Sequence, residues 1–160
     1  MPKRTIAAEP NQHSIVATVH FNAPRDLVYK LLTDPNLIPD WWGPEGLTTT
    51  VDKMDTRPGG SWRYIVAADS GKEWRFHGVY HALETPNTIV STHEYEDEPG
   101  HVSLESLVLT DSDGGTKMTT TSVFQSVEDR DNMLKSDFQD GEQESLNRLE
   151  KLLDSMLIAK

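Results

Sequence analysis

The stretch that decides the fold is residues 61–84, SWRYIVAADSGKEWRFHGVYHALE. Two runs rich in aromatic and apolar residues, 61–67 and 72–84, stand on either side of Asp69-Ser70-Gly71. Such runs are typical of β-strands, and the residues between them favour a tight turn, so the stretch predicts a hairpin. Because side chains alternate between the two faces of a strand, the large rings gather on one face: Trp62, Tyr64, Trp74, Phe76 and Tyr80.

Five further strand-like runs surround this hairpin. They are residues 14–21, 48–55, 88–95, 102–111 and 116–124. Turn residues separate neighbouring runs, as at Pro58-Gly59-Gly60, Glu98-Pro99-Gly100 and Asp113-Gly114-Gly115. Together with the hairpin, these runs predict a seven-stranded antiparallel meander.

Helical patterns stand at both ends of the strand region. Two short helices are expected after the first strand, the second within residues 35–44, which are bounded by prolines. Near the C-terminus, apolar residues repeat at helical spacing, and Ser126 with Asp129 resembles a capping box. One long helix is therefore expected from about residue 128 to residue 157, spanning roughly 45 Å at 1.5 Å per residue.

Length, charge and hydropathy exclude several classes of protein. A chain of 160 residues predicts one domain over residues 14–160, preceded by a flexible tail at residues 1–13. The net charge of −11 repels phosphate backbones, which argues against a nucleic-acid partner. No apolar run approaches the roughly 20 residues that cross a bilayer. The chain has no cysteine, so it can form neither a disulfide nor a cysteine-ligated metal site. We expect a cytoplasmic protein without a membrane partner, as a monomer or weak dimer.

The predicted C-terminal helix has a gap in its apolar stripe. Its centre presents Gly141, Glu142 and Ser145 where large side chains are expected. Glycine inside a helix costs about 1 kcal/mol relative to alanine, so a requirement other than helix stability favours it here. Two outcomes are open for the space between this gap and the aromatic face. Either the backbone closes onto the rings, or a cavity of roughly a few hundred cubic ångströms remains for an apolar or aromatic ligand.

Several short motifs occur in order along the chain. They are residues 57–62 (RPGGSW), 76–80 (FHGVY), 114–116 (GGT), 124–126 (FQS), 128–134 (EDRDNML) and 141–149 (GEQESLNRL). With Trp41-Trp42-Gly43-Pro44, the chain resembles the START-like helix-grip superfamily, and within it the homologues of the C-terminal domain of the activator of heat-shock-protein-90 ATPase. The resemblance implies an α+β helix-grip fold. In it a curved seven-stranded antiparallel sheet wraps around the long C-terminal helix, with a deep cavity between them.

The resemblance leaves three functions open, because members of this superfamily share a fold and differ in activity. The first is binding of a small hydrophobic or aromatic molecule in the cavity, with no cofactor. The second is a cofactor-independent enzyme of the cyclase or hydrolase kind, in which an inward carboxylate and a histidine share proton transfer. The third is a stress-related module that contacts a chaperone, suggested only by the family name. No nucleophile motif is present, so no catalytic residue is assigned.

The candidate ligand-binding residues are those expected to face the cavity. They are Trp41, Trp62, Tyr64, Trp74, Phe76, Tyr80, His93, Tyr95, Phe138, Gly141, Glu142 and Ser145. Two roles are open for Trp41, a gate at the cavity mouth or a residue that closes the core. Two are also open for Glu142, an inward acid or base or a solvated position on the helix flank. His93 is expected either to orient a ligand or to be a structural histidine.

A metal site is not expected. His77 and His81 lie four residues apart on one strand face, opposite the aromatic residues. Four residues of strand separate them by about 13 Å, whereas zinc holds each ligand at roughly 2.1 Å, so they cannot share an ion.

Overall fold

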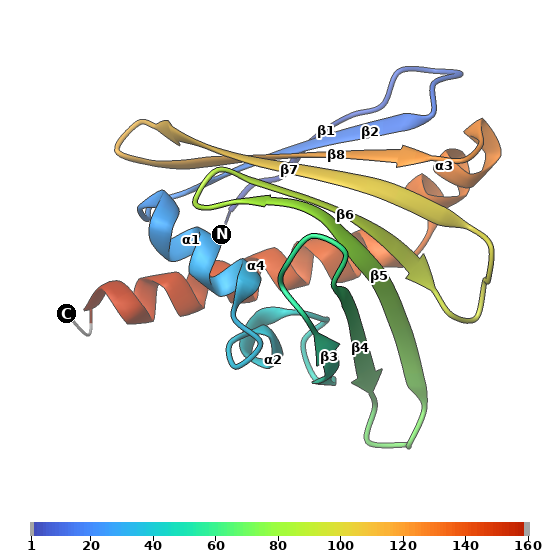
Figure 1. Cartoon of the computed structure of the whole chain (residues 1–160), viewed down its shortest axis with the longest axis horizontal. Helices are drawn as coiled ribbons and strands as arrows, with labels where there is room; N and C mark the ends of the chain where they lie inside the picture. Colours follow the sequence, from blue (N-terminus) through green and yellow to red (C-terminus); the bar gives the residue numbers. More distant parts are fainter. Residues whose placement is uncertain (1, 159–160) are drawn as a thin grey trace.

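The computed structural model describes residues 2–158, which form one antiparallel sheet and four helices (Figure 1). The strands are β1 (Thr5–Ala7), β2 (Ser14–Phe21), β3 (Thr48–Met54), β4 (Ser61–Ala67), β5 (Glu73–Glu84), β6 (Thr88–Tyr95), β7 (Val102–Ser112) and β8 (Gly115–Phe124). The helices are α1 (Arg25–Thr33), α2 (Ile38–Trp41), α3 (Val127–Lys135) and α4 (Phe138–Ile158). The α+β class and the helix-grip arrangement are confirmed, but the sheet has eight strands rather than seven.

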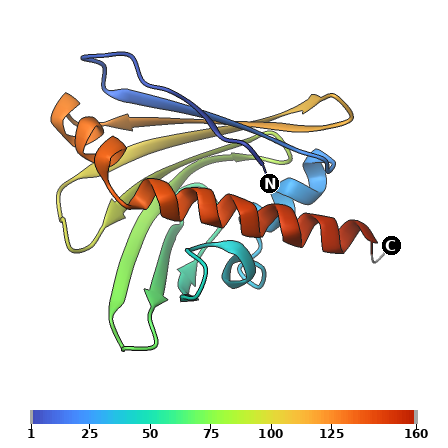
Figure 2. The same cartoon turned by 180° about the vertical axis from the view of Figure 1, so that it is seen from behind.

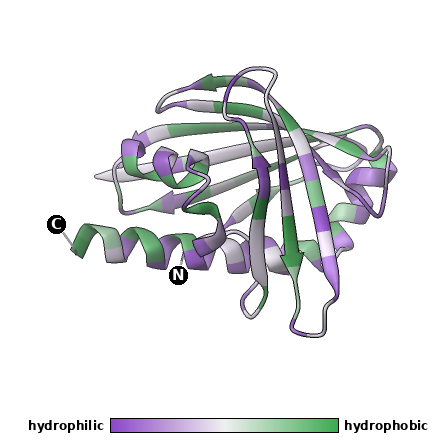
Figure 3. Cartoon of the chain, turned by 60° about the horizontal axis from the view of Figure 1, so that its bottom comes forward, coloured by the Kyte–Doolittle hydropathy of each residue, from purple (hydrophilic) through white to green (hydrophobic). Residues whose placement is uncertain are grey.

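The seven predicted strands all form, and their alternation is the reason. In β4, every second residue is buried, so Trp62, Tyr64 and Val66 face inward. Hydrophobic and hydrophilic residues correspondingly recur along the strands in Figure 3. The sheet order is β1-β2-β8-β7-β6-β5-β4-β3, with consecutive strands from β3 to β8 joined as a meander.

The eighth strand, β1, lies in the segment predicted as a flexible tail. It pairs antiparallel with β2, placing Ile6 opposite Ala17. Three residues are too few for an alternating pattern to be recognised, and the pairing partner is the otherwise open edge of β2. Just before β1, Arg4 reaches α4 and donates to the carboxylate of Glu142. The N-terminal segment therefore joins the edge of the sheet to α4.

The prediction of one continuous C-terminal helix is wrong, because the helix is interrupted at Ser136. The backbone of Ser136 is extended (ψ 158°), and its hydroxyl donates to the carbonyl oxygen of Met133 over 2.8 Å. A serine that bonds the preceding turn offers the backbone an alternative to further helix. At the other end of α3 the predicted cap is confirmed, since the hydroxyl of Ser126 accepts the N–H of Asp129 at 3.0 Å.

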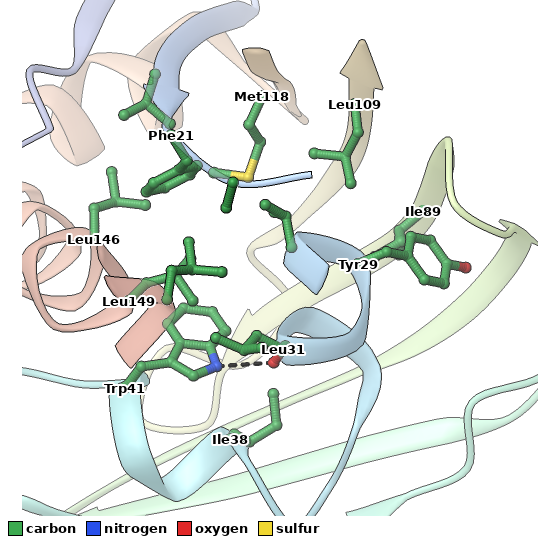
Figure 4. Packing of buried hydrophobic residues seen from close by; sticks show 14 of the residues in the cluster. Phe21, Tyr29, Leu31, Ile38, Trp41, Ile89, Leu109, Met118, Leu146 and Leu149 are labelled. Atoms are coloured by element: carbon green, nitrogen blue, oxygen red, sulfur yellow. Dashed lines mark hydrogen bonds between the residues drawn. The ribbon is translucent and has the colours of Figure 1, made fainter. Parts of the chain in front are cut away.

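Helix α4 crosses the concave face of the curved sheet, with α1 and α2 towards one end and α3 towards the other (Figures 1 and 2). The side chains that fill the α1–α2 end include Phe21, Leu31, Ile38, Leu109 and Leu149, which are almost fully buried (Figure 4). We call this the closed end, and we call the region where α3, the start of α4 and the β6–β7 turn meet the open end.

Candidate functional site

The small residues at the centre of α4 are matched by the chain segment between α2 and β3. The hydroxyl of Ser145 accepts the N–H of Gly43 at 2.9 Å and donates to the carbonyl oxygen of Gly141 at 3.0 Å. A methyl group on Gly141 would lie 3.5 Å from Cγ of Pro44. The gap in the apolar stripe therefore accommodates the Gly43-Pro44 segment, so at this point the chain itself occupies the space.

Arg148 holds the same segment from one turn further along α4. Its guanidinium donates to the carbonyl oxygen of Gly43 at 2.9 Å. Longer bonds of 3.3 to 3.4 Å run to the carbonyl oxygens of Pro39, Asp40 and Trp42. Carbonyl groups at the end of a short helix have no partner within that helix, so Arg148 caps α2.

The two neighbouring tryptophans have different surroundings. Trp41 is buried in the core, and its indole N–H donates to the carbonyl oxygen of Leu31 at 2.8 Å (Figure 4). Trp42 instead packs edge-on against Tyr64 and Phe76, with ring centroids 5.0 and 5.3 Å apart. Much of the aromatic face that the sequence predicts is thus covered by Trp42, a residue absent from the predicted site.

The remaining rings of the predicted site are placed on the inward face of β4 and β5. Tyr64 and Tyr80 are buried, and burial is the main reason that the pKa of each phenol is raised. Trp74 is only partly buried, and the ammonium of Lys72 lies 4.8 Å from the centre of its ring. Trp74 therefore lies at the margin of the inward aromatic face, packed against the core on one side and contacted by Lys72.

A glycine allows Trp62 to lie flat across two strands. The indole N–H of Trp62 donates to the carbonyl oxygen of Thr92 at 3.2 Å. A Cβ atom on Gly78 would come within 1.8 Å of that oxygen and 2.6 Å of the indole nitrogen. Gly78 is thus required by the close approach of the indole, and it brings Trp62 against His93 with ring centroids 5.8 Å apart.

A pocket of about 350 Å³ lies at the open end. It is lined by residues from β6, the β6–β7 turn, β7, β8 and both C-terminal helices: His93, Tyr95, Glu98, Pro99, His101, Ser103, Phe124, Asp129, Asn132, Met133, Ser136 and Phe138. Of the twelve predicted site residues, three line this pocket, namely His93, Tyr95 and Phe138. The break at Ser136 shapes it, because α3 and α4 approach the sheet as separate segments.

His93 forms the inner wall of this open-end pocket. Its ring lies between those of Trp62 and Phe76, the second at a centroid distance of 5.5 Å. Burial lowers the pKa of His93 to about 4, with a further lowering by His77. The imidazole is therefore neutral at pH 7, with one nitrogen that donates a hydrogen bond and one that accepts.

Tyr95 and Phe138 form a second wall. Tyr95 stacks on Phe76 at 5.2 Å, and Phe138 packs edge-on against both rings at 5.2 and 5.8 Å. The Tyr95 hydroxyl donates to Asp97 at 3.0 Å, and burial together with this carboxylate raises the pKa of Tyr95 to about 12. The phenol is therefore neutral and stays oriented toward the turn.

An exposed ion pair links the two sides of the pocket. His101, in the β6–β7 turn, lies with Nδ1 2.9 Å from Oδ1 of Asp129 on α3. The Asp129 carboxylate raises the pKa of His101. The contact connects α3 to the β6–β7 turn. Its contribution to the stability of the fold is small, because His101 is exposed to solvent.

Glu142, for which an inward acid or base and a solvated flank position are both open from the sequence, pairs with Arg4 and not with a histidine. The carboxylate of Glu142 pairs with Arg4, and its side chain is 56% exposed, whereas that of Arg4 is 8% exposed. The inward carboxyl of the sheet is Glu105 on β7, which shares its face with the buried residues Ser103 and Leu109. The same alternation that located the aromatic rings indicates this position, but we did not include Glu105 among the predicted residues.

A second, smaller hollow of about 280 Å³ lies beside α1, lined by Tyr29, Thr33, Thr56, Arg57, Pro58, Leu83 and Thr85. Arg57 there is exposed and pairs with Asp55. Within residues 2–158, no group of three or more His, Cys, Asp or Glu side chains is arranged to hold a metal ion. His77 instead lies between Glu94 and Glu96 on the outer face, at 3.0 Å from each.

The sheet that grips α4 and the pocket beside α3 define a helix-grip protein of the START-like class. Residues 22–154 match the family model described as Activator of Hsp90 ATPase homolog 1-like protein. The chain therefore belongs to this family.

Solved structures from three bacteria share the fold. Protein Ms6760 from Mycobacterium smegmatis is 23% identical, with a TM-score of 0.85 over 96% of this chain and 97% of that chain. A protein from Rhodobacter sphaeroides is 22% identical, with a TM-score of 0.88 over 96% and 99%. One from Staphylococcus epidermidis is 24% identical, with a TM-score of 0.81 over 95% and 94%. No curated protein matches the chain. Likeness at these identities concerns the fold and leaves the function to be argued from the site.

The helices give no indication of a membrane span. None of those formed by residues 2–158 is both long enough and apolar enough to cross a bilayer.

Proposed function

We propose that this protein binds a small molecule with an aromatic or apolar body in the open-end pocket. The observation that carries the proposal is the pocket itself, whose volume of about 350 Å³ falls within the range of small-molecule sites. Its walls combine large apolar side chains, Phe124, Met133 and Phe138, with a few polar groups. Such a combination supplies binding energy through burial and orientation through hydrogen bonds.

Neutral His93 is the main orienting group in this proposal. It lies inside the pocket, and its lowered pKa keeps it uncharged at pH 7. A neutral imidazole bonds a ligand hydroxyl or carbonyl without the cost of burying a charge. The contribution of the aromatic face differs from the sequence-based hypothesis. Trp42 covers part of this face, and Tyr95 and Phe138, which pack on Phe76, line the pocket.

Calorimetric titration with a panel of alkylbenzenes, phenols and short arylalkyl compounds tests the proposal. We expect dissociation constants on the order of 10 to 1000 μM for ligands of this size. The variant Met133→Trp should abolish binding by filling the pocket. Val108→Trp is the matched control, because Val108 is exposed on the outer face of β7. The proposal is contradicted if no compound of the panel binds, or if Met133→Trp binds the ligands as tightly as Val108→Trp does.

A further inference from the structure

Glu105 lies behind the open-end pocket on the same inward face of β7. It is one inward position beyond Ser103, a pocket-lining residue, and two residues of strand advance the chain by about 7 Å. Its cross-strand neighbours are Ser91 on β6 and Ser122 on β8. On α4, Glu142 follows the pocket residue Phe138 by one helical turn. Polar side chains of β6, β7 and β8 therefore follow the pocket-lining residue Ser103 along the sheet.

One carboxylate oxygen of Glu105 is without a partner. Ser122 gives the carboxyl one hydrogen bond. The other oxygen, Oε2, is buried and has no hydrogen-bond partner among the described residues. Buried polar atoms in folded proteins are nearly always paired, because an unpaired one costs about 1 to 3 kcal/mol. The orphaned oxygen thus indicates a donor that the chain itself does not provide.

The charges around Glu105 define what that donor is. Glu142 lies near enough for its charge to act on Glu105, and Arg4 pairs with Glu142. Two carboxylates and one guanidinium leave one negative charge uncompensated when Glu105 is ionised. Burial, with the charge of Glu142, raises the pKa of Glu105 to about 7. The ionised form of Glu105 therefore has no cationic partner of its own among the described residues.

Building on the proposed function, we infer that the ligand of the open-end pocket is an arylalkyl or alkyl amine whose ammonium group binds Glu105. In the proposed complex the apolar body lies against Phe124, Met133 and Phe138. The ammonium passes Ser103, the pocket-lining residue next to Glu105 on the inward face of β7, and bonds the orphaned oxygen, which becomes accessible only when the ligand enters. A protonated amine supplies both the missing donor and the missing charge. A neutral ligand supplies only a donor, and an anion adds a second negative charge beside Glu142.

Three ligands of similar shape separate these cases. Calorimetric titration at pH 8 would use 3-phenylpropylamine, 3-phenyl-1-propanol and 3-phenylpropionate. We expect the amine to bind about tenfold or more tightly than the alcohol, since a charge-assisted bond is roughly twice as strong as a neutral one. The carboxylate should bind most weakly. The Glu105→Gln variant should lose the preference for the amine, and Glu84→Gln, at an exposed end of β5, is the matched control.

Titration at two pH values gives an independent measurement. The amine keeps its proton between pH 6 and pH 8, because alkyl amines titrate near pH 10. Glu105 is mostly protonated at pH 6 and mostly ionised at pH 8, so the affinity for the amine should rise about tenfold over this range. Affinity for the alcohol should stay nearly constant in the wild type. In Glu105→Gln most of the pH dependence for the amine should disappear, and the part that remains is that of His101, a pocket-lining residue whose pKa the Asp129 carboxylate raises.

The outcomes distinguish this inference from the proposed function. If the alcohol and the amine bind with equal affinity, or Glu105→Gln keeps the preference for the amine, the inference is overturned while ligand binding stands. If none of the three ligands binds, and the wider panel also fails, both are overturned. Melting temperatures of both variants show whether each is folded under the conditions of titration.

Discussion

The two ends of the concave face use the same helix and the same sheet in opposite ways. At the closed end, Ser145 and Arg148 hydrogen-bond the backbone between α2 and β3, and Trp42 packs on the sheet rings. At the open end, α3 and the start of α4 approach the sheet mainly through side chains and leave a pocket of about 350 Å³. Small helix residues therefore mark where the chain packs closely, and the helix break marks where space remains.

The closed end and the open end of the concave face differ in what they contribute to the protein. Close backbone contacts at the closed end stabilise the fold, because each removes a polar group that would otherwise be unpaired. The open end provides the lining for a ligand. Variants at the two ends should accordingly separate stability from binding.

The largest effect is expected at Arg148. Replacement by Met keeps the apolar stem and removes every hydrogen bond to the carbonyl groups at the end of α2. We expect a loss of about 3 kcal/mol in the free energy of unfolding, measured by urea denaturation. Ligand affinity at the open end should be unchanged. Lys151→Met, exposed on the same helix, is the control and should have little effect.

His93 should destabilise the folded protein as the pH falls. Glu105 opposes this effect over part of the same pH range, so the effect of His93 is taken from the difference between wild type and a His93 variant. The pKa of His93 is about 4 in the folded protein and 6.5 in the reference state, so the unfolded chain takes up the proton first. The stability that neutral His93 provides is present above pH 6.5 and is lost as the pH falls toward 4. In His93→Gln this loss, on the order of 2 kcal/mol, should be absent from urea titrations between pH 6.5 and 4. If His93→Gln loses as much stability as the wild type between pH 6.5 and 4, the lowered pKa of His93 is contradicted.

Glu105 should act with the opposite sign. Its pKa is about 7 in the folded protein and 4.5 in the reference state, so the folded chain holds the proton longer. The associated stability is present below pH 4.5 and is lost as the pH rises to 7. Glu105→Gln should therefore be more stable than wild type at pH 8 by up to about 2 kcal/mol, and the two proteins should converge toward pH 4.5. Thermal unfolding across this range measures the difference.

A smaller effect is expected at the first turn of α3. Ser126→Ala removes the hydroxyl that accepts the N–H of Asp129, at a cost of about 1 kcal/mol. Because Asp129 and Met133 line the open-end pocket, ligand affinity should fall as well. Ser126→Asp retains a capping acceptor and should keep both properties close to wild type.

The smallest change concerns the centre of α4. Gly141→Ala adds a methyl group at ordinary contact distance from Pro44, and it lowers the flexibility of the unfolded chain. We expect a gain of about 0.5 kcal/mol in stability with unchanged ligand binding. A loss of stability would show that the approach of the Gly43-Pro44 segment tolerates no additional atom.

The sequence predicts the strands well because each carries its own alternation and is bounded by turn residues. The same parity correctly places Trp62, Tyr64 and Phe76 inward. It cannot show which remote segment fills the space opposite them, and Trp42 does so through contacts between distant parts of the chain. The helix break depends on one hydroxyl of Ser136, a residue that is equally compatible with a continuous helix.

The orphaned oxygen of Glu105 is invisible to sequence inspection for a different reason. Alternation indicates that its side chain faces inward, but the absence of a partner depends on three neighbouring strands and α4. His93 and Tyr95 were predicted from parity as one inward pair, and both line the pocket. Residues of α3 are absent from the predicted site, because the bend at Ser136 that brings them to the pocket has no clear signal in the sequence.

The two margins of the sheet differ from its interior in a way that bears on self-association. One margin is β1, only three residues long, and the other is β3, interrupted by a bulge between Val51 and Lys53. A strand as short as β1, or one with a bulge and charged residues as in β3, offers a poor template to an incoming strand of another molecule. Pairing between the sheet edges of two copies of the protein is therefore disfavoured.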